Sequence, residues 1–277
     1  MSDNILARRR QQAGRALVAT HRGTAGGLVY PNTLAAAQLA LVSGSDIVEL
    51  DVVRTRDGQY VTFHDGYEST LLGASRSLTD MSATEVQAQR YGRFQTNAGV
   101  APVEAYRDVI GALPEVVVNV DRSYRYWELG FLDELATWAD PALMVLKSPV
   151  RDTCLRALAE CETAFPFIPI VRSEEEIDRV RAWEGINLIG LEVLAERPDD
   201  QLADAGYLAG LKAQGLLIWL NAINLEDGWD RYCGWDDLTS LRQDPDQGWG
   251  RLVRQGADVI QTDYPWLLRP YLEARQA

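Results

Sequence analysis

The chain has 277 residues, of which 47% are hydrophobic and 24% charged, and its formal net charge at pH 7 is −13. This length and composition are those of a globular protein with a full hydrophobic core, and one α/β barrel of this size is ordinary. The negative charge argues against general nucleic-acid binding, which needs a basic surface. It also opposes an anionic substrate at long range, so any phosphate site has to be made positive locally.

The cysteines and the N-terminus indicate where the protein works. Cys154, Cys161 and Cys233 are odd in number and form no close metal-type pair, which favours buried thiols in a reducing compartment. No signal peptide or transmembrane run is visible in the sequence. We therefore expect a cytoplasmic protein without stable membrane insertion and with a small molecule as its partner, and the sequence leaves the oligomeric state open.

Short apolar runs alternate with helical segments along the chain. The expected strands are residues 16–20, 47–53, 116–121, 142–147, 167–171, 188–193, 216–221 and 258–262. Helices are expected at 3–12, 34–42 and 102–113, within 124–138 and at 151–161. A further helix is expected to begin after residue 173. Another is expected to end at residue 253, after a long acidic loop at 224–246. Eight strands that alternate with helices predict a (β/α)8 TIM barrel, which we expect to form a single domain over residues 1–277.

Residues 66–101 contain no obvious barrel strand. A helix with a capping box is expected from Ser82 to Gln89, since a serine followed three residues later by a glutamate is a helix-start signal. We interpret this stretch as a small subdomain inserted after the second barrel strand.

Glu49 and Asp51 lie two residues apart on the expected strand 47–53. Side chains alternate across a strand, so both carboxylates point to the same face. Two carboxylates held this close raise each other's pKa unless a cation lies between them. Hard oxygen ligands favour Mg²⁺ or Ca²⁺; the alternative interpretation is a solvated strand face without an ion.

His21 and His64 are the only histidines of the chain. Each follows directly after an expected strand, and the acid pair lies between them in the sequence. Histidine is the side chain best suited to move protons near neutral pH. One such histidine is commonly structural, but two in equivalent positions indicate a proton-transfer site.

Five sequence blocks, in order, carry a resemblance to a known family. They are His21-Arg22-Gly23, Pro31 to Ala37, Gly44 to Val52, Thr55 to Gly58 and His64-Asp65. At nearly this spacing they resemble the glycerophosphodiester phosphodiesterases, and Thr262 to Pro265 looks like that family's closing strand signature. The resemblance implies a metal-dependent phosphodiester hydrolase that cleaves glycerophosphodiesters to glycerol phosphate and an alcohol.

The resemblance also implies roles for individual residues. A divalent cation, Mg²⁺ or Ca²⁺, would be held by Glu49, Asp51 and Asp121, since zinc would be expected to recruit histidine or cysteine. His21 is expected to act as base and His64 as acid, although the sequence alone allows the reverse.

Two positively charged residues are candidates for phosphate binding. Arg22, next to His21, offers a planar donor fork to a phosphate oxygen. Lys147, at the end of the fourth expected strand, would add a second positive charge; the alternative for it is an ordinary solvated lysine.

The chain departs from the family pattern at two places. The Pro-Glu-Asn-Thr of the family is Tyr30-Pro31-Asn32-Thr33 here, so the usual acid is absent, and the Glu-x-Lys of the third strand is Asp121-Arg122-Ser123. Lys147 is our candidate substitute for the missing lysine. These departures indicate a divergent subgroup and leave open the alcohol that is released and whether the phosphate product is open or cyclic.

Two other functions compete with the first. A phospholipase D-like enzyme acting on lysophospholipids or sphingolipids would use the same residues with an apolar rim, for which Trp229 and Trp235 are candidates. A catalytically inactive binding protein is the third hypothesis, and loss of metal binding would favour it.

Overall fold

The computed structural model describes residues 4–25, 29–92, 101–225 and 228–275. Within these ranges, eight parallel strands close into a barrel, because β1 pairs with both β2 and β9. The barrel strands are β1 (Leu17–Thr20), β2 (Ile47–Arg54), β4 (Val117–Asp121), β5 (Met144–Pro149), β6 (Phe167–Val171), β7 (Gly190–Val193), β8 (Leu217–Asn221) and β9 (Val259–Thr262). The predicted TIM barrel is thus confirmed.

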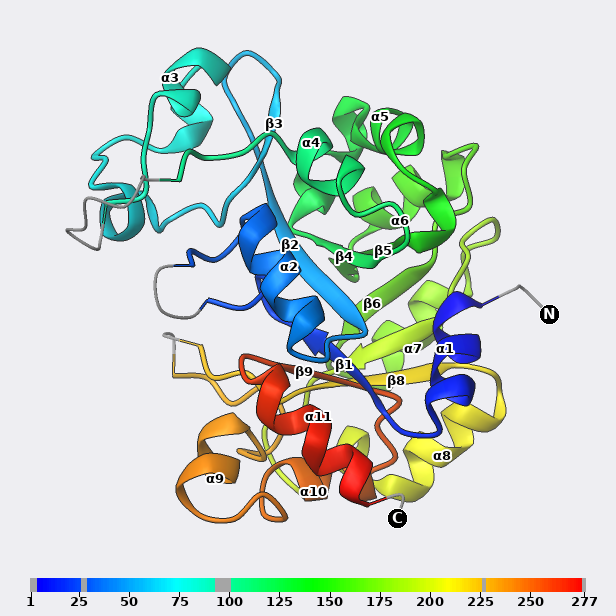
Figure 1. Cartoon of the computed structure of the whole chain (residues 1–277). Helices are drawn as coiled ribbons and strands as arrows, with labels where there is room; N and C mark the ends of the chain where they lie inside the picture. Colours follow the sequence, from blue (N-terminus) through cyan, green and yellow to red (C-terminus); the bar gives the residue numbers. More distant parts are fainter. Residues whose placement is uncertain (1–3, 26–28, 93–100, 226–227, 276–277) are drawn as a thin grey trace.

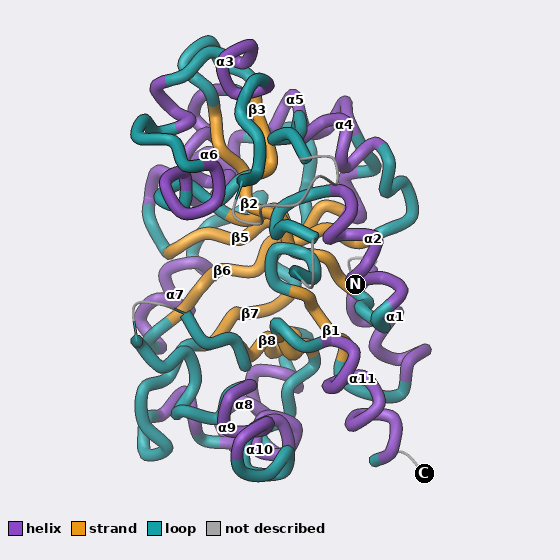
Figure 2. Tube along the Cα trace, turned by 60° about the vertical axis from the view of Figure 1, so that its left-hand side comes forward, coloured by secondary structure: helices purple, strands orange, loops and turns teal. Residues whose placement is uncertain are grey.

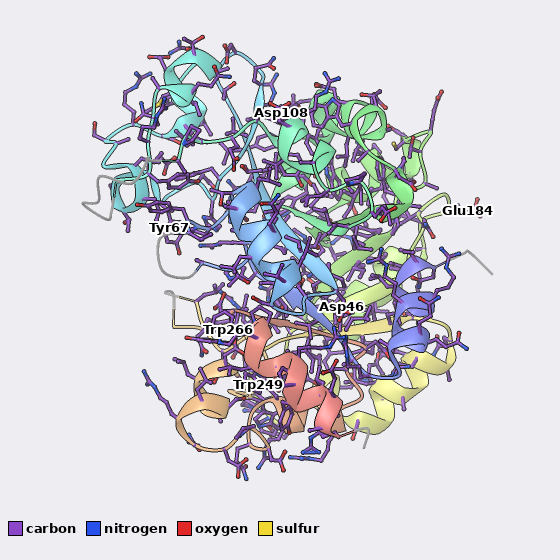
Figure 3. All side chains as sticks on the ribbon, viewed as in Figure 1. Asp46, Tyr67, Asp108, Glu184, Trp249 and Trp266 are labelled. Carbon is purple, nitrogen blue, oxygen red and sulfur yellow. The ribbon has the colours of Figure 1, made fainter. Side chains whose placement is uncertain are left out.

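Helices surround this sheet (Figures 1 and 2). They are α1 (Ile5–Ala13), α2 (Leu34–Val42), α4 (Tyr106–Gly111), α5 (Phe131–Trp138), α6 (Asp152–Glu160), α7 (Glu174–Arg181), α8 (Ala205–Ala213), α9 (Asp237–Arg242), α10 (Trp249–Arg254) and α11 (Pro265–Ala274). Short 3₁₀ turns connect several of them: η3 (Ser123–Leu129), η4 (Pro141–Leu143) and η5 (Gln201–Ala203). Figure 3 shows the side chains that fill the space between strands and helices.

The barrel interior is apolar at one end and polar at the other. One buried cluster inside the barrel includes Leu17, Ile47, Val117 and Trp219. Leu6 of α1 belongs to the same cluster. Because strand side chains alternate, the inward positions further along the same strands lie above this cluster. Those positions hold polar residues, and they lie at the carboxyl ends of the strands, where barrel proteins carry their sites.

The segment after β2 leaves the barrel and forms a projection of its own (Figure 1). It contains β3 (Tyr60–Thr62), antiparallel to β2, then η1 (Glu68–Leu72), η2 (Leu78–Asp80) and α3 (Ala83–Gln87), which has the predicted capping box at Ser82. A separate buried cluster, including Phe63, Met81 and Tyr91, holds it together. Residues 93–100 of the predicted insertion lie outside the described residues, and its division from the barrel as a subdomain stays a prediction.

Two predicted elements differ from the structure. The helix expected at 102–113 covers only Tyr106–Gly111, because Pro102 and Ala105 form bridges with Arg90 and Val61 and are therefore extended. The loop expected at 224–246 contains helix α9, which the Asp236 side chain caps by accepting from the Thr239 amide. No described helix combines the length and apolar character that a membrane crossing requires.

Candidate active site

Three carboxylates meet at the carboxyl end of the barrel. Glu49 and Asp51 point inward from β2, and Asp121 ends β4 directly opposite Asp51 in the parallel register. One oxygen of each residue lies within 4.8 Å of the others. Burial raises the pKa of Glu49 well above its usual value, and the charges of Asp51 and Asp121 raise it further. Burial and the charge of Asp51 likewise raise the pKa of Asp121.

This cluster fits a hard divalent cation. The Oε1 atom of Glu49 is buried and has no hydrogen-bond partner, which is costly for a carboxylate oxygen unless a cation binds it. Among the described residues the ligand cluster consists of three carboxylates, and oxygen donors suit Mg²⁺ or Ca²⁺ better than zinc. The sequence predicted this triad, and the barrel register brings its members together.

The loop after β1 holds the carboxylates in place. The backbone amide of Arg22 donates to Glu49 Oε2 at 2.6 Å, and Arg22 Nε lies 3.3 Å from Asp51 Oδ2. Asn32 contacts the same aspartate twice, donating from Nδ2 to Asp51 Oδ2 at 2.8 Å and accepting from the Asp51 amide at 2.9 Å. Arg22 and Asn32 both have positive φ, 54° and 57°, a strained conformation that concentrates at functional sites. Sequence reasoning missed Asn32, for which the Pro-Asn-Thr run was the available signal.

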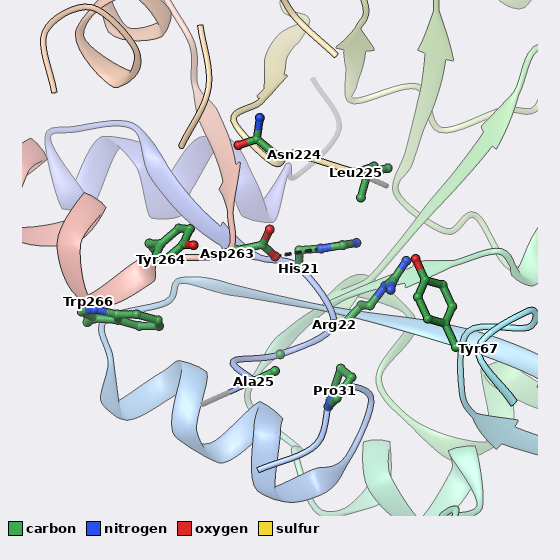
Figure 4. A pocket seen from close by; sticks show the side chains of 11 residues that line it. His21, Arg22, Ala25, Pro31, Tyr67, Asn224, Leu225, Asp263, Tyr264 and Trp266 are labelled. Atoms are coloured by element: carbon green, nitrogen blue, oxygen red, sulfur yellow. Dashed lines mark hydrogen bonds and ion pairs between the residues drawn. The ribbon is translucent and has the colours of Figure 1, made fainter. Parts of the chain in front are cut away.

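His21 is oriented by a carboxylate that directly follows the last strand of the barrel. Its Nδ1 lies 2.9 Å from Asp263 Oδ1 (Figure 4). Behind Asp263, the fully buried Asp237 accepts from the Asp263 amide at 2.9 Å and from the indole of Trp249 at 2.7 Å. Burial raises the pKa of Asp237 to about 8. The imidazole therefore has a fixed orientation, with Nε2 as its remaining nitrogen for proton transfer.

His64 has a different environment. Its Nδ1 lies 2.8 Å from the backbone oxygen of Asp65; because a carbonyl only accepts, Nδ1 carries a proton and Nε2 remains for chemistry. Burial lowers the pKa of His64, and the charges of Arg22 and Arg122 lower it further against the opposing effect of Asp51. The ring of Tyr67 packs edge-on against His64 at 4.9 Å and supports the Arg22 guanidinium at 4.8 Å.

Two cavities meet at His21 and Arg22. The central one, about 180 Å³, is lined by both histidines and by Asp51, Asp121 and Glu192 among others. The second, about 330 Å³, shares His21 and Arg22 and extends toward Tyr264 and Trp266 (Figure 4). The site therefore has room on both sides of a group bound between the histidines.

Lys147 lies beneath the central cavity, with only 1% of its surface exposed. Its Nζ is 2.6 Å from Glu192 Oε2 and 3.3 Å from the centre of the Trp219 ring. The other oxygen of Glu192 accepts from Asn221 at 2.7 Å. Lys147 thus has a buried carboxylate partner, and the prediction that it binds phosphate remains a prediction. Sequence reasoning missed Glu192, which lines the cavity; its position near the end of the expected strand 188–193 was the available signal.

The fold and the site together define a (β/α)8-barrel protein with a carboxylate cluster and a histidine pair at its C-terminal mouth. The sequence profile of the glycerophosphoryl diester phosphodiesterase family matches residues 21–136, the range that contains both histidines and the carboxylate triad. A second profile, of a domain of unknown function named DUF4996, matches residues 167–272. The part of the chain that carries the two histidines and the three carboxylates is therefore similar to the glycerophosphoryl diester phosphodiesterase family.

Curated relatives carry related names. The putative glycerophosphodiester phosphodiesterase YhdW of Bacillus subtilis is 37% identical over 160 residues, which are 55% of this chain and 63% of that protein. Lysophospholipase D GDPD1 of Rattus norvegicus is 30% identical over 126 residues, 42% of this chain and 39% of that protein. The human protein of the same name is 29% identical over 306 aligned positions, covering 97% of this chain and 90% of its own. The chain thus spans only part of the first two relatives.

Solved structures share the fold. An Oleispira antarctica phosphodiesterase, solved with its product sn-glycerol-3-phosphate, is 19% identical with a TM-score of 0.68, covering 95% of this chain and 98% of that one. A glycerophosphoryl diester phosphodiesterase of Parabacteroides distasonis is 15% identical with a TM-score of 0.67, covering 94% and 87%. Both similarities extend over nearly the whole barrel.

Proposed function

We propose that this protein is a metal-dependent phosphodiesterase that cleaves glycerophosphodiesters to glycerol phosphate and an alcohol. The observation that carries this proposal is the buried triad of Glu49, Asp51 and Asp121 beside two histidines at one cavity. The name of the Bacillus relative and the product bound in the Oleispira neighbour support the substrate class.

Glu49, Asp51 and Asp121 would hold the cation, Mg²⁺ or Ca²⁺. When bound, it supplies charge neutralisation for phosphate oxygens in the transition state. Arg22 lines the same cavity, and its guanidinium is steadied by Asp51 and Tyr67. We assign it the role of donating to a phosphate oxygen, since a planar fork suits that group.

His21 and His64 divide the proton transfers between them. We assign His21 as base, because the Asp263 carboxylate orients its ring and stabilises the imidazolium that forms when it accepts a proton. It would take the proton from an attacking water or substrate hydroxyl. His64 would then donate from Nε2 to the departing alcohol, while its Nδ1 keeps its bond to the Asp65 carbonyl.

Lys147 remains our second candidate for charge at the phosphate site. Lys147 forms an ion pair with Glu192, and Glu192 rather than Lys147 is among the residues that line the cavity. Lys147 would therefore act on the site through the Glu192 carboxylate. We propose that Lys147 offsets the negative charge of the acids at the mouth, and that a direct phosphate contact would require Glu192 to move.

A phospholipase D-like activity on lysophospholipids is the second candidate. Trp235 is buried and Trp229 is stacked between two arginines, so the apolar rim expected from these two does not form. Trp266 and Tyr264 provide apolar surface instead, in the cavity beside His21, and Trp266 is 40% exposed. The relatives named lysophospholipase D support this alternative.

A ³¹P NMR time course distinguishes these functions. A mixture of glycerophosphodiesters and, separately, a lysophospholipid are incubated with the protein and Mg²⁺ or Ca²⁺, and then with a chelator. We expect chelator-sensitive release of glycerol phosphate, and a cyclic phosphate signal would identify a substrate hydroxyl as nucleophile. Turnover of the lysophospholipid alone would favour the second function, and no turnover by folded, metal-supplemented protein would favour an inactive binding protein.

We also propose a cytoplasmic location. Cys154, Cys161 and Cys233 are all free thiols in the structure, as expected for a reducing compartment. Fractionation of cells that express the full-length protein would test this.

A further inference from the structure

Arginine is concentrated at the central cavity of a strongly acidic chain. The described residues that line the cavity include four arginines, Arg22, Arg122, Arg172 and Arg231, and three carboxylates, Asp51, Asp121 and Glu192. The Glu192 charge is already matched by Lys147 beneath it. Among the described residues that line this cavity, arginines therefore outnumber carboxylates, although the chain as a whole carries a net charge of −13.

Arg122 lies on the His64 side of the cavity. It follows β4 with a φ of 57°, and its Nη2 lies 2.6 Å from Asp65 Oδ1. Arg125 contacts the other oxygen of Asp65, also at 2.6 Å. One carboxylate is shared by two guanidinium groups, so Asp65 does not neutralise both of them, and Arg122 lies beside the histidine that we assign to the departing alcohol.

Arg172 extends the positive surface toward β6. Its guanidinium lies 5.2 Å from the centre of the Trp229 ring, and the Trp229 indole is itself held by Glu196 at 2.6 Å. Arg172 forms no ion pair with any residue that the structure describes. Stacking on an aromatic ring orients a guanidinium without neutralising it, so Arg172 retains its charge for a ligand.

The neighbouring cavity bounds this surface. It has a volume of about 320 Å³, shares Arg172 with the central cavity, and is lined beyond it by carboxylates. These are Glu174, Glu175, Glu196 and Asp200. An anion is therefore favoured on the Arg122 and Arg172 side of the mouth and disfavoured farther out.

We propose that Arg122 and Arg172 form a subsite for a second anionic group, a phosphate or a carboxylate, on the alcohol half of the substrate. The inference rests on the proposed phosphodiesterase function and names its substrate class. The alcohol leaves from the His64 side, where Arg122 lies, so a charged group on it reaches the arginines. A choline or ethanolamine cation at the same place meets two like charges, which opposes its binding.

Matched substrate pairs test the subsite. Glycerophosphoinositol 4-phosphate and glycerophosphoinositol differ only in one phosphate, and glycerophosphoserine and glycerophosphoethanolamine differ only in one carboxylate. We expect kcat/KM to be on the order of tenfold higher for the more anionic member of at least one pair, and this advantage to shrink as salt rises. The two pairs show which anion the subsite prefers.

Variants assign the preference to these residues. Arg172→Gln and Arg122→Gln should each reduce the within-pair ratio of kcat/KM by roughly three- to tenfold. Arg179→Gln, in which a surface arginine paired with Asp152 is changed, removes the same net charge away from the mouth and should keep the wild-type ratio. Because the ratio compares two substrates in one variant, a general loss of catalysis cancels.

The outcomes separate the two proposals. A wild-type enzyme that hydrolyses all four substrates without favouring either anionic member would overturn the subsite and leave the phosphodiesterase function standing. A preference that survives both arginine variants would also overturn it. Absence of hydrolysis of every substrate in the presence of metal would instead contradict the phosphodiesterase function itself.

Discussion

His21 Nδ1 lies 2.9 Å from Asp263 Oδ1, and this contact joins residues that are 242 positions apart in the chain. His21 follows β1 and Asp263 follows β9, and the two strands pair in parallel from Leu17 with Val259 to Thr20 with Thr262. Closure of the barrel therefore creates the histidine–carboxylate pair. A protein with an open sheet would have both residues without the pair.

Asp263→Asn should lower kcat by on the order of 10²-fold, because an amide can donate to Nδ1 and so favour the wrong tautomer of His21. Steady-state kinetics with a glycerophosphodiester would measure this. The melting temperature of the variant should stay close to that of wild type, since Asp263 is partly exposed. Unchanged kcat would show that Asp263 does not position the base.

His64→Ala should lose on the order of 10²–10⁴-fold in rate with an alkyl alcohol as leaving group. It should lose far less with a p-nitrophenyl phosphodiester, whose leaving group departs without a proton. His21→Ala should be impaired with both substrates. If the p-nitrophenyl substrate restored the rate of His21→Ala and not that of His64→Ala, His21 would be the acid and His64 the base.

The pH dependence follows from the same assignment. Because the pKa of His64 is lowered from 6.5, its acid form is lost as pH rises through a value below 6.5. The wild-type rate with alkyl alcohols should therefore fall on the alkaline side, and the p-nitrophenyl substrate should lack that fall. A pH–rate profile for each substrate would measure it, and identical profiles would argue against His64 as the acid.

Glu49→Gln should abolish tight cation binding and yet stabilise the chelated protein. Burial, together with the charges of Asp51 and Asp121, raises the pKa of Glu49 above its usual value of 4.5, so folding favours the protonated carboxyl, and stability is lost as pH rises above 4.5 toward the folded-state pKa. Melting curves of chelated wild-type protein should show this loss, and Mg²⁺ or Ca²⁺ should reverse it. In Glu49→Gln the contribution should be absent; equal pH dependence in both proteins would show that the pKa of Glu49 is not raised in the folded protein.

Lys147→Met should destabilise the protein by about 3–5 kcal/mol, because it leaves the charge of Glu192 in a low-dielectric interior without its partner. The double variant Lys147→Met with Glu192→Met should recover much of this free energy of unfolding. Denaturant unfolding of wild type, the two single variants and the double variant gives the coupling between the two sites. A stable single variant with a raised KM would favour a direct phosphate contact instead.

Trp266→Ser tests the apolar side of the mouth. Loss of this half-exposed indole should raise KM for a lysophospholipid several-fold through lost apolar contact. Its effect on glycerophosphocholine, which has no acyl chain, should be small. Equal effects on both substrates would mean that the cavity next to Trp266 gives no support to the phospholipase D-like function.

Local sequence patterns were sufficient to predict the fold and part of the geometry of the candidate site. Alternation along residues 47–53 placed Glu49 and Asp51 on one face, and the order of strands and helices predicted the barrel. Both follow from short-range rules: the period of a strand and the need of each helix to cover the sheet. The ends of strands were therefore recognisable as the places where polar residues gather.

What only the tertiary structure decided is which of these polar residues meet. Asn32 contacts Asp51, Lys147 pairs with Glu192, and Arg172 stacks on Trp229, each across elements that share no local pattern. Such partners depend on the stagger of the strands and on how the barrel closes, which shift whole strands relative to one another. Sequence by itself determined the class of side chains at the mouth, and the closed barrel determined their pairs, because contact between distant residues is a property of the assembled sheet.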